Sequence, residues 1–411
     1  MGQKAFAPSG RRAHHATLIA TNKIERFLPL HRSRYDRPPR TEPALTLRLV
    51  SSEAGFAALR ADWNRLVERT GGPVFLRHEW FSAAWAWQRT DAATLWIACA
   101  YAGDRLVGVL PLMRPPTSHS GTRLLQFLSV PDAQWCDVLI EPDLGSVVAR
   151  TLVSQLLLHS GSWDVLRLDR LAIRSQAARW FAPALTEQGL AARVDTVDCN
   201  LFVDRKSGWP EYHASLSRSI KKTCNLAANR LGRLGTPSVQ WVTAATIGAN
   251  EVNRHVDEIV AISARSWKHV TGNSLDRPGP QAFIRALTET AFAQNWLSVW
   301  FLRIGDVAVA MEYQLQLDGH IHAMRADFDA NFKSISPGTY LNFKMLEALF
   351  GSGHSRYYMG PGNNPYKSRW SEAGEPVQTL TSYSPTMRGR AGALWSEVKP
   401  RLKTWRDRLT P

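Results

Sequence analysis

The sequence predicts an α/β protein made of two α/β domains in tandem. From Leu45 onward, apolar runs of strand length alternate with longer segments whose apolar residues recur at helical spacing. A hairpin pattern, two apolar strands joined by a Gly-Asp turn, occurs near 95–112 and again near 297–314 and indicates a duplicated unit. The 411 residues, 44% of them hydrophobic, suffice for two or three domains.

The first domain is expected over residues 44–204. One helix is predicted from Phe56 to the Gly71-Gly72 pair, because apolar residues recur there every three or four positions and glycine commonly ends a helix. Strands are predicted where short apolar runs lie between turn residues. The further helices are expected at 78–88, 145–159 and 176–188, and the strands at 45–50, 94–101, 105–112, 124–128, 136–140, 165–169 and 192–197.

A basic connecting helix is expected over residues 205–236. Its apolar stripe comprises Leu216, Ile220, Cys224, Ala227, Leu231 and Leu234. Lysines and arginines fill the remaining positions, so one side should pack and the other should face water or a polyanion. The basic side is either a binding surface or merely a solvated face.

The second domain is expected over residues 237–385 and repeats the layout of the first. A strand at 239–243 precedes helices at about 250–268 and 280–294. Strands at 297–304 and 307–317 then form the second hairpin around the turn Gly305-Asp306. The stretch from His320 to Trp370 reads as strand, loop, helix, strand and glycine-rich loop.

The formal net charge of +15 is concentrated in three segments. These are 1–43, 205–235 and 385–411, and the rest of the chain is close to neutral. Residues 1–43 are expected to be a disordered basic arm, with a transit peptide as the alternative, and 386–411 a basic C-terminal helix. Such basic patches fit tRNA or another nucleic acid, an anionic membrane surface or a phosphorylated substrate.

The cysteine pattern and hydropathy exclude several classes of protein. Four widely spaced cysteines, without a C-x-x-C pair or a histidine cluster, predict neither a disulfide framework nor a metal site. Cys136 is either a candidate nucleophile or an ordinary buried cysteine. No apolar run of 18 residues occurs, and no secretory leader is recognisable, so we expect no transmembrane segment and a cytoplasmic location.

The loop Ser336-Pro337-Gly338 comes directly before a helix whose apolar positions include Leu341 and Met345. A free helix N-terminus presents unpaired N–H groups and a partial positive charge, which suits a phosphate or pyrophosphate. The alternative is that Ser336 caps an ordinary helix that has Pro337 in its first turn.

Three motifs together resemble a known family. They are L-S-R-S-I-K-K in the basic helix, F-D-A-N-F-K-S-I-S-P-G before the last long helix, and G-P-G-N-N-P-Y-K-S-R-W after it. In these motifs the chain resembles the CelD/BcsL-type acetyltransferases of the FemAB-like group, over about residues 45–384. The resemblance implies two tandem GNAT-like (acyl-CoA N-acyltransferase) domains, each a mixed, largely antiparallel sheet flanked by helices.

The resemblance also implies a donor site. In GNAT folds the donor's pyrophosphate lies on the loop and helix N-terminus after the fourth strand, which here are Ser336, Pro337, Gly338 and Thr339. The donor implied is acetyl-CoA, used as a co-substrate without a metal. This loop has fewer glycines than the usual GNAT loop and lacks its common Arg or Gln. In FemAB-type relatives the donor is an aminoacyl-tRNA.

The closing Tyr366-Lys367 pair implies a catalytic or phosphate-binding role for Lys367, with Tyr366 and Arg369 as substrate contacts. An ammonium stabilises an oxyanion well in a site shielded from water. The alternative is a surface lysine beside Arg369.

Four further residues are candidates for the site. Asp327 is a candidate general base, and a structural pair with Arg325 on the same strand face is its alternative. His322 is the alternative base or a structural histidine. Tyr340 is either the proton donor to a leaving thiolate or a packing residue, and Asp137 is expected among the acceptor contacts.

The function expected from the resemblance is transfer of an acyl group, with acetyl-CoA as the expected donor, to an amine or hydroxyl of a sugar or amino-sugar precursor of an exopolysaccharide. Aminoacyl transfer from tRNA in cell-wall synthesis is the second hypothesis. A protein that keeps the fold without its chemistry, as a nucleic-acid-binding or scaffold protein, is the third.

Overall fold

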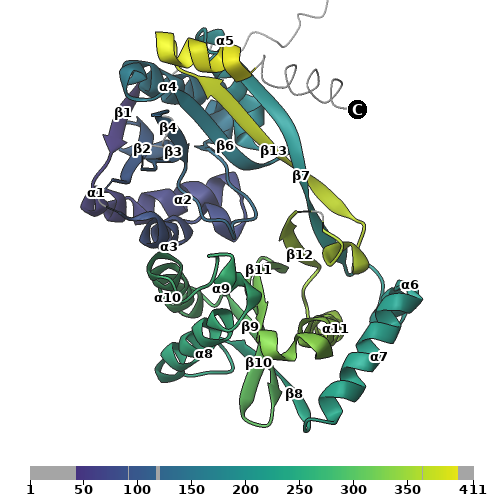
Figure 1. Ribbon diagram of the computed structural model, residues 1–411. Coiled ribbons are helices and arrows are strands. Elements are labelled where there is room, and N and C mark those ends of the chain that lie inside the picture. Colours follow the sequence, from purple (N-terminus) through teal and green to yellow (C-terminus); the bar gives the residue numbers. More distant parts are fainter. Residues whose placement is uncertain (1–42, 91, 117–120, 363, 397–411) are drawn as a thin grey trace, which may run out of the picture. The chain divides into compact units, whose positions relative to one another are not determined.

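The computed structural model describes residues 43–90, 92–116, 121–362 and 364–396. Within these residues one sheet of 13 strands runs through both halves of the chain, with helices on its faces (Figure 1). The expected basic arm, 1–43, lies outside the described residues except for its last position. Residues 387–396 of the expected C-terminal helix are helical, and 397–411 lie outside the described part.

The first half contains seven strands and five α-helices within the described residues. Its strands are β1 (Leu45–Val50), β2 (Thr94–Ala102), β3 (Arg105–Arg114), β4 (Leu124–Phe127), β5 (Leu139–Ile140), β6 (Val165–Ala172) and β7 (Ala192–Asp204). Its helices are α1 (Glu53–Ala58), α2 (Arg60–Thr70), α3 (His78–Gln88), α4 (Gly145–Leu158) and α5 (Ala182–Glu187), the last preceded by a π-helical turn (Ala177–Phe181).

The second half repeats the alternation of strands and helices. Its strands are β8 (Pro237–Thr243), β9 (Leu297–Ile304), β10 (Val307–Leu317), β11 (His320–Phe328), β12 (Arg356–Pro361) and β13 (Gly374–Tyr383). Its helices are α6 (Trp209–Ser215), α7 (Arg218–Gly232), α8 (Val252–Ala264), α9 (Trp267–Val270), α10 (Pro278–Ala293) and α11 (Pro337–Gly351).

Local sequence explains the predicted hairpins. Both β2–β3 and β9–β10 turn at a glycine with positive φ, Gly103 at 58° and Gly305 at 56°, a conformation that glycine adopts without steric cost. The strands on either side are apolar and buried on both faces, because helices cover the sheet. Both predicted hairpins are therefore confirmed.

The sheet order shows that the two halves share strands. The order is β1-β2-β3-β4-β6-β13-β7-β12-β11-β10-β9-β8, with β5 paired to β3. The last strand, β13, lies between β6 and β7 of the first half and is antiparallel to both (Figure 1). The 13-residue β7 pairs with β13 and, at its end, with β12. The chain thus returns to complete the sheet of its first half.

Strands β11 and β12 part after a short parallel ladder. Only His320, Ile321 and His322 of β11 pair with β12. Along the β10–β11 ladder, Met324 is an extra residue on β11, because Gln314 pairs with Ala323 and Tyr313 with Arg325. A bulge of this kind bends a strand and increases its twist. Beyond it, β11 and β12 leave a gap in the sheet.

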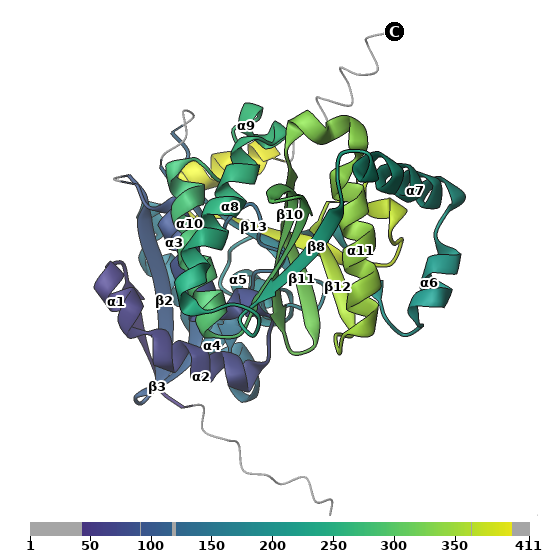
Figure 2. The same ribbon diagram turned by 90° about the horizontal axis from the view of Figure 1, so that it is seen from below.

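Opposite faces of the second-half sheet carry different helices (Figure 2). Helices α8 and α10 cover the sheet face on which the side chain of Tyr313 lies. The hydroxyl of Tyr313 accepts a hydrogen bond from Thr288 of α10 at 3.3 Å. Helix α11 covers the other face, where Gln314 contacts the sulfur of Met345. Phe283 of α10 also packs edge to face on Trp80 of α3, which joins the two halves.

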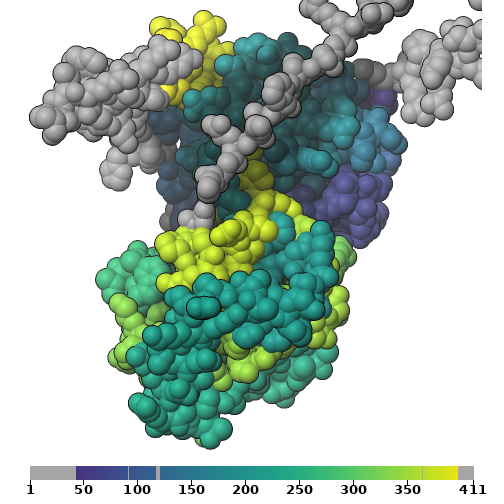
Figure 3. All heavy atoms as spheres, turned by 90° about the vertical axis from the view of Figure 1, so that its right-hand side faces the viewer, coloured from purple at the N-terminus to yellow at the C-terminus, as the bar shows by residue number. Residues whose placement is uncertain are grey.

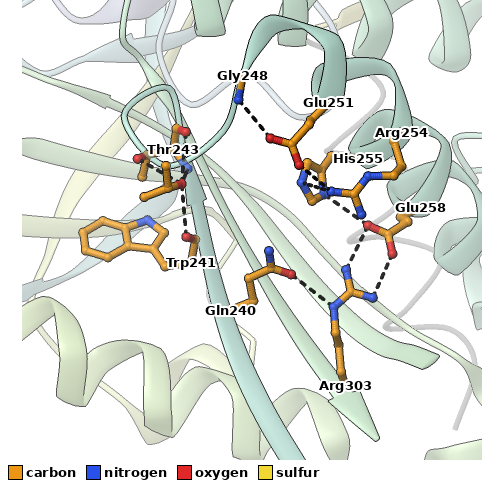
Figure 4. A network of polar contacts seen from close by, with 10 residues as sticks. Gln240, Trp241, Thr243, Gly248, Glu251, Arg254, His255, Glu258 and Arg303 are labelled. Atoms are coloured by element: carbon orange, nitrogen blue, oxygen red, sulfur yellow. Dashed lines mark hydrogen bonds and ion pairs between the residues drawn. The ribbon is translucent and has the colours of Figure 1, made fainter. Parts of the chain in front are cut away.

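Helix α8 is tied to the edge strands by a polar network (Figure 4). Arg303 of β9 forms ion pairs of 2.8 Å and 2.9 Å with Glu258 of α8 and donates to Gln240 of β8 at 3.1 Å. Glu258 also contacts the buried His255 at 3.1 Å. Burial lowers the pKa of His255, so the network holds a neutral imidazole.

Helix α7 is amphipathic as expected. Ser217 caps its N-terminus, and Ile220, Cys224 and Leu231 are buried against the core of the second half. Its outer face, which includes Arg218, Lys222 and Arg233, is exposed; Figure 3 shows this side of α6 and α7. None of the helices in the described ranges is long and apolar enough to cross a membrane.

Some predicted elements were wrong in their limits. The strand expected at 136–140 is reduced to Leu139–Ile140, because the N–H of Cys136 donates to the carbonyl of Arg170 in β6 and Cys136 joins no ladder. The basic connecting helix is two helices, since Leu216 and Ser217 adopt extended backbone angles. The helix expected at 250–268 breaks at Ser266, whose hydroxyl caps α9.

Candidate functional site

The gap between β11 and β12 opens into a cavity of about 640 Å³. Its lining comes from both halves of the chain: Pro131 to Ala133 and Arg170 from the first, and α9, β10–β12, α11 and the loop after β12 from the second. Neighbouring residues of β10 face opposite sides of the sheet, and the cavity touches residues on both sides. The cavity therefore passes through the sheet where β11 and β12 part.

The N-terminus of α11 forms one wall. Ser336, Gly338 and Thr339 line the cavity, whereas Pro337 is buried behind them at the first helical position. Ser336 has φ 62°, a left-handed conformation that is costly for a residue with a side chain, and its hydroxyl makes no capping bond. The alternative of an ordinary serine cap is therefore wrong, and the first turn of α11 faces the cavity without a side-chain cap.

Buried polar groups lie beside this helix end. Tyr357 donates a hydrogen bond of 2.6 Å to Glu312, and both side chains are buried. Gln314 donates to the same carboxyl oxygen at 2.8 Å. Burial raises the pKa of Glu312 and that of Tyr357. Asn342, 2% exposed, has a side-chain oxygen without a hydrogen-bond partner among the described residues.

Asp327 lies on the opposite face in a buried ion cluster. One of its oxygens is 2.8 Å from Nε of Arg325, and the other is 2.6 Å from Nζ of Lys268. Arg325 also lies 3.3 Å from Asp132 of the first half. The expected alternative, a structural Arg325–Asp327 pair, is present. Both oxygens of Asp327 are thus engaged in ion pairs.

Lys367 lies in the cavity and is not a simple surface lysine. Its ammonium donates to the carbonyls of Gly360 at 2.7 Å and Pro361 at 2.8 Å. Burial, together with repulsion from Arg170 and Lys268, lowers the pKa of Lys367 to about 8, although Asp198 acts in the opposite direction. Three cations thus approach one another beside the gap, which favours the binding of an anion or of developing negative charge.

Gln134 of the first half reaches into the gap. Its Nε2 donates to the carbonyls of Ala323 on β11, at 2.8 Å, and Tyr358 on β12, at 3.3 Å. Its Oε1 faces Nδ1 of His322 at 3.0 Å and accepts from Asn200 at 3.3 Å. This fully buried amide bridges the two strands where their own ladder ends.

His322 faces a second cavity, of about 380 Å³, on the other side of Gln134. Because both hydrogens of the Gln134 amide are directed at carbonyls, Oε1 is its acceptor and the imidazole proton lies on Nδ1. Burial, and to a smaller extent His320, lower the pKa of His322 to about 3. His322 is thus a neutral acceptor through Nε2.

Asp137 lines the same second cavity but uses its oxygens elsewhere. They accept from the backbone N–H groups of Val138, Gln176 and Ala177, so Asp137 holds the start of the helical segment at 177. Burial raises the pKa of Asp137 to about 7 against these bonds. Burial raises the pKa of Cys136 to about 11, which leaves this thiol protonated and makes it a poor nucleophile.

The remaining predicted residues divide into two groups. Tyr366 lines the large cavity, and its hydroxyl is 3.4 Å from the carbonyl of Gly338. Tyr340 packs on the core of the second half and Arg369 is exposed; neither lines either cavity. The structure brings Lys367, Asp327, Tyr366 and the Ser336 loop together, and separates His322 and Asp137 from them.

Sequence reasoning missed several cavity residues. Glu312 had a usable signal, as the one charged residue in the apolar strand Val307–Leu317, and Asn342 had another, as a polar residue on the buried stripe of α11. Lys268, Arg170 and Gln134 had none, because folding brings them in from distant positions. Within the described residues, no cluster of three or more His, Cys, Asp or Glu has the arrangement of a metal site.

Comparison with known proteins identifies a known domain within the chain. Residues 218–368, which include α7, α11 and Lys367, match the model of the family described as "Acetyltransferase (GNAT) domain". A search of curated proteins finds no match.

Among solved structures, a conserved protein of unknown function from Bacteroides thetaiotaomicron VPI-5482 has a TM-score of 0.51 and 10% identity, over 82% of this chain and 100% of that one. FemX has a TM-score of 0.49 and 8% identity, over 85% and 99%. A tandem GNAT protein from the clavulanic acid biosynthesis pathway has a TM-score of 0.45 and 11% identity, over 83% and 99%.

The protein has the fold of two GNAT-like units in tandem, and the domain match supports an acyltransferase activity. Residues 218–368 are its acetyltransferase (GNAT) domain, and they contribute most of the cavity through the sheet.

Proposed function

We propose that the protein transfers an acetyl group from acetyl-CoA to an amine or hydroxyl of a sugar or amino-sugar precursor. One observation carries the proposal: a single cavity joins the uncapped N-terminus of α11 to Lys367 through the gap between β11 and β12. A phosphate-bearing donor fits the helix end, and the gap admits a narrow chain toward Lys367.

The donor end is formed by Ser336, Gly338 and Thr339 together with Lys333, which also lines the cavity. The N–H of Gly338 and the helix dipole favour a pyrophosphate, and the lysine adds charge. In this proposal the thioester lies deeper, beside Glu312 and Tyr357.

The reaction forms one bond and breaks one. The acceptor's nitrogen or oxygen attacks the thioester carbonyl, the C–S bond breaks, and the proton that the acceptor loses passes through solvent to the leaving thiolate. Lys367 stabilises the negative charge that develops on the carbonyl oxygen. Tyr357, whose raised pKa keeps its proton, donates it in a hydrogen bond to Glu312, and the two side chains form a polar wall on the donor side.

The biological setting proposed is exopolysaccharide production, on the strength of the resemblance to CelD/BcsL-type acetyltransferases in the S-I-S-P-G and N-P-Y-K-S-R-W motifs. The proposed compartment is the cytoplasm, where acyl-CoA is available. The four cysteines, all unpaired, are compatible with a reducing environment.

Calorimetry with acetyl-CoA, longer acyl-CoA and acyl-carrier protein tests the donor. We expect acetyl-CoA to bind the wild-type protein and to bind more weakly to Lys333→Ala, with Lys206→Ala, an exposed lysine outside both cavities, as control. Failure of all three donors to bind would end the thioester proposal.

A second candidate function, aminoacyl transfer from tRNA, is favoured by the position of the basic helix. Arg230 of α7 donates to the carbonyl of Ser334 at 2.6 Å, so the exposed basic face of α7 lies next to the donor loop. An anionic membrane is an alternative partner for the same face. The tRNA hypothesis predicts salt-sensitive binding in a gel-shift assay, which the double variant Lys222→Glu with Arg233→Glu abolishes. If tRNA does not bind the wild-type protein in this assay, the hypothesis is wrong.

A further inference from the structure

The second cavity differs from the first in the chemistry of its lining. It is formed by the loop at Gly72 and Pro73, the segment Trp135–Asp137, the β10–β11 turn and strands β11, β12 and β13. Neither lysine nor arginine lines it, whereas Lys268, Lys333, Lys367 and Arg170 line the large cavity. The two cavities therefore favour ligands of opposite polarity.

The polar groups of the second cavity accept hydrogen bonds. His322 is 3% exposed and its unprotonated Nε2 has no partner among the described residues, since only Nδ1 is engaged. Asp318 projects from the turn between β10 and β11 and has no ion pair in the described part of the chain. Glu375 adds a second carboxylate, which is shared with Arg356 at 2.9 Å.

The apolar groups are flat rings. Trp135 lines the cavity, and the imidazole of His322 stacks on Tyr358 with an interplanar angle of 9° and 5.1 Å between centroids. Aromatic faces with hydrogen-bond acceptors at the edge suit a ring that carries several O–H or N–H donors. An anionic ligand would instead meet the carboxylates of Asp318 and Glu375, beside the carboxyl group of Asp137.

We propose that the second cavity is the acceptor site and that the acceptor is an amino sugar. Its ammonium faces Asp318, its ring lies against Trp135 and the His322–Tyr358 pair, and a hydroxyl at the opposite end of the ring, facing Gln134, is the group that accepts the acetyl. This inference rests on the proposed acetyl transfer and names its acceptor. The volume of about 380 Å³ lies in the range of small-molecule sites.

Gln134 stands at the boundary between the two cavities. His322 and Tyr358 line the second cavity, and their chain neighbours Ala323 and Tyr357 line the first. The Gln134 side chain bridges these residues, so its removal should join the cavities. In this arrangement Gln134 is a positioning residue that sets where the acceptor hydroxyl meets the donor.

Binding of glucosamine without donor tests the proposal, by calorimetry or saturation-transfer NMR. We expect millimolar or tighter binding of glucosamine, about tenfold weaker binding of glucose, and no binding of glucose 6-phosphate at equal concentration. Asp318→Asn should weaken glucosamine binding about tenfold. Asparagine tolerates the left-handed conformation of this position, φ 50°, so the turn is kept.

Asp306→Asn is the matched control, because Asp306 occupies the corresponding exposed turn between β9 and β10 and lines neither cavity. His322→Phe keeps a ring against Tyr358 and removes Nε2, and should weaken glucosamine binding as well. Acetyl-CoA binding by each variant shows that it is folded.

The outcomes separate the two proposals. If acetyl-CoA binds and glucosamine does not, the acceptor inference is overturned and the proposed donor stands. If glucosamine binds with an unchanged affinity in Asp318→Asn, or if glucose 6-phosphate binds better than glucosamine, the inference is also overturned. If glucosamine binds as expected but no acyl donor does, the second cavity remains an amino-sugar site and the proposed transfer fails.

Discussion

The ammonium of Lys367 donates a 2.7 Å hydrogen bond to the carbonyl of Gly360 at the point where β12 has parted from β11. Gly360 has φ +81°, and a side chain there would point between Nζ of Lys367 and Nε2 of Gln134, each 3.7 Å from its Cβ position. The parting of the two strands thus brings the ammonium of Lys367, from the second half, and the amide of Gln134, from the first half, together beside Gly360.

If Lys367 acts as a cation, activity should fall as pH rises. Burial lowers the pKa of Lys367 to about 8, so the ammonium is present below pH 8 and is lost above it. We expect kcat to decline above about pH 8 in the wild type, and to stay level to higher pH in Lys367→Arg, because arginine keeps its charge. Lys367→Met should lower kcat by roughly 10²–10³. The pH profile of Lys367→Arg would contradict the assignment if it declined at the wild-type pH.

Asp327→Asn distinguishes an ion-pair role from a base role. This substitution would leave Lys268 and Arg325 without their shared carboxylate, and loss of one partner of a buried pair costs about 3–5 kcal/mol. We therefore expect urea unfolding to show a large loss of stability. Lys268→Met, which leaves Arg325 on Asp327, should cost less. A general base would instead show a kcat loss of about 10²–10⁴ at unchanged stability.

Gly338→Ala separates donor binding from folding. An added Cβ would lie 3.5 Å from Phe328, an ordinary contact, and alanine favours a helix by up to about 1 kcal/mol. Stability should therefore be kept or increased. The same methyl enters the cavity at the helix end, and KM for acetyl-CoA should rise by on the order of tenfold. Gly351→Ala, at the other end of α11 with nothing within 4 Å, is the control.

Gly108→Ala tests the packing of the first half. Its Cβ would lie 2.3 Å from Cγ1 of Val148 on α4, so strand and helix would have to move apart. We expect a loss of about 1–3 kcal/mol in thermal or urea unfolding. Val148→Ala should rescue part of this loss in the double variant, because the two sites share one contact. Gly161→Ala, in open space, should have little effect, and an equal loss there would contradict the packing explanation.

Elements with local signals were predicted well from the sequence. The limits of α3, β9 and β10 match the predicted ones, since apolar periodicity and flanking turn residues fix them locally. Long-range features were not predicted. Nothing between Gly374 and Tyr383 reveals that this strand pairs with Leu168 and Val194 in the first half.

The residues of the candidate site divide in the same way, into those with a local sequence signal and those that only long-range contacts define. Ser336-Pro337-Gly338 and Tyr366-Lys367 were recognised because their residue types and order are informative along the chain. Gln134 was missed because its role depends on Ala323, 189 positions later, and the distinction between two cavities depends on that contact. The roles assigned to all these residues stay predictions until the variants are measured.

The position of β13 in the sheet also constrains when the first half can fold during synthesis. β6 and β7 of the first half are separated by a strand that ends at Tyr383, so ribosomal synthesis must pass that residue before the first sheet can close. Until then the nascent first half exposes two unpaired strand edges. A product that stops short of β13 would therefore also leave the first half, already translated, without the strand that joins β6 to β7.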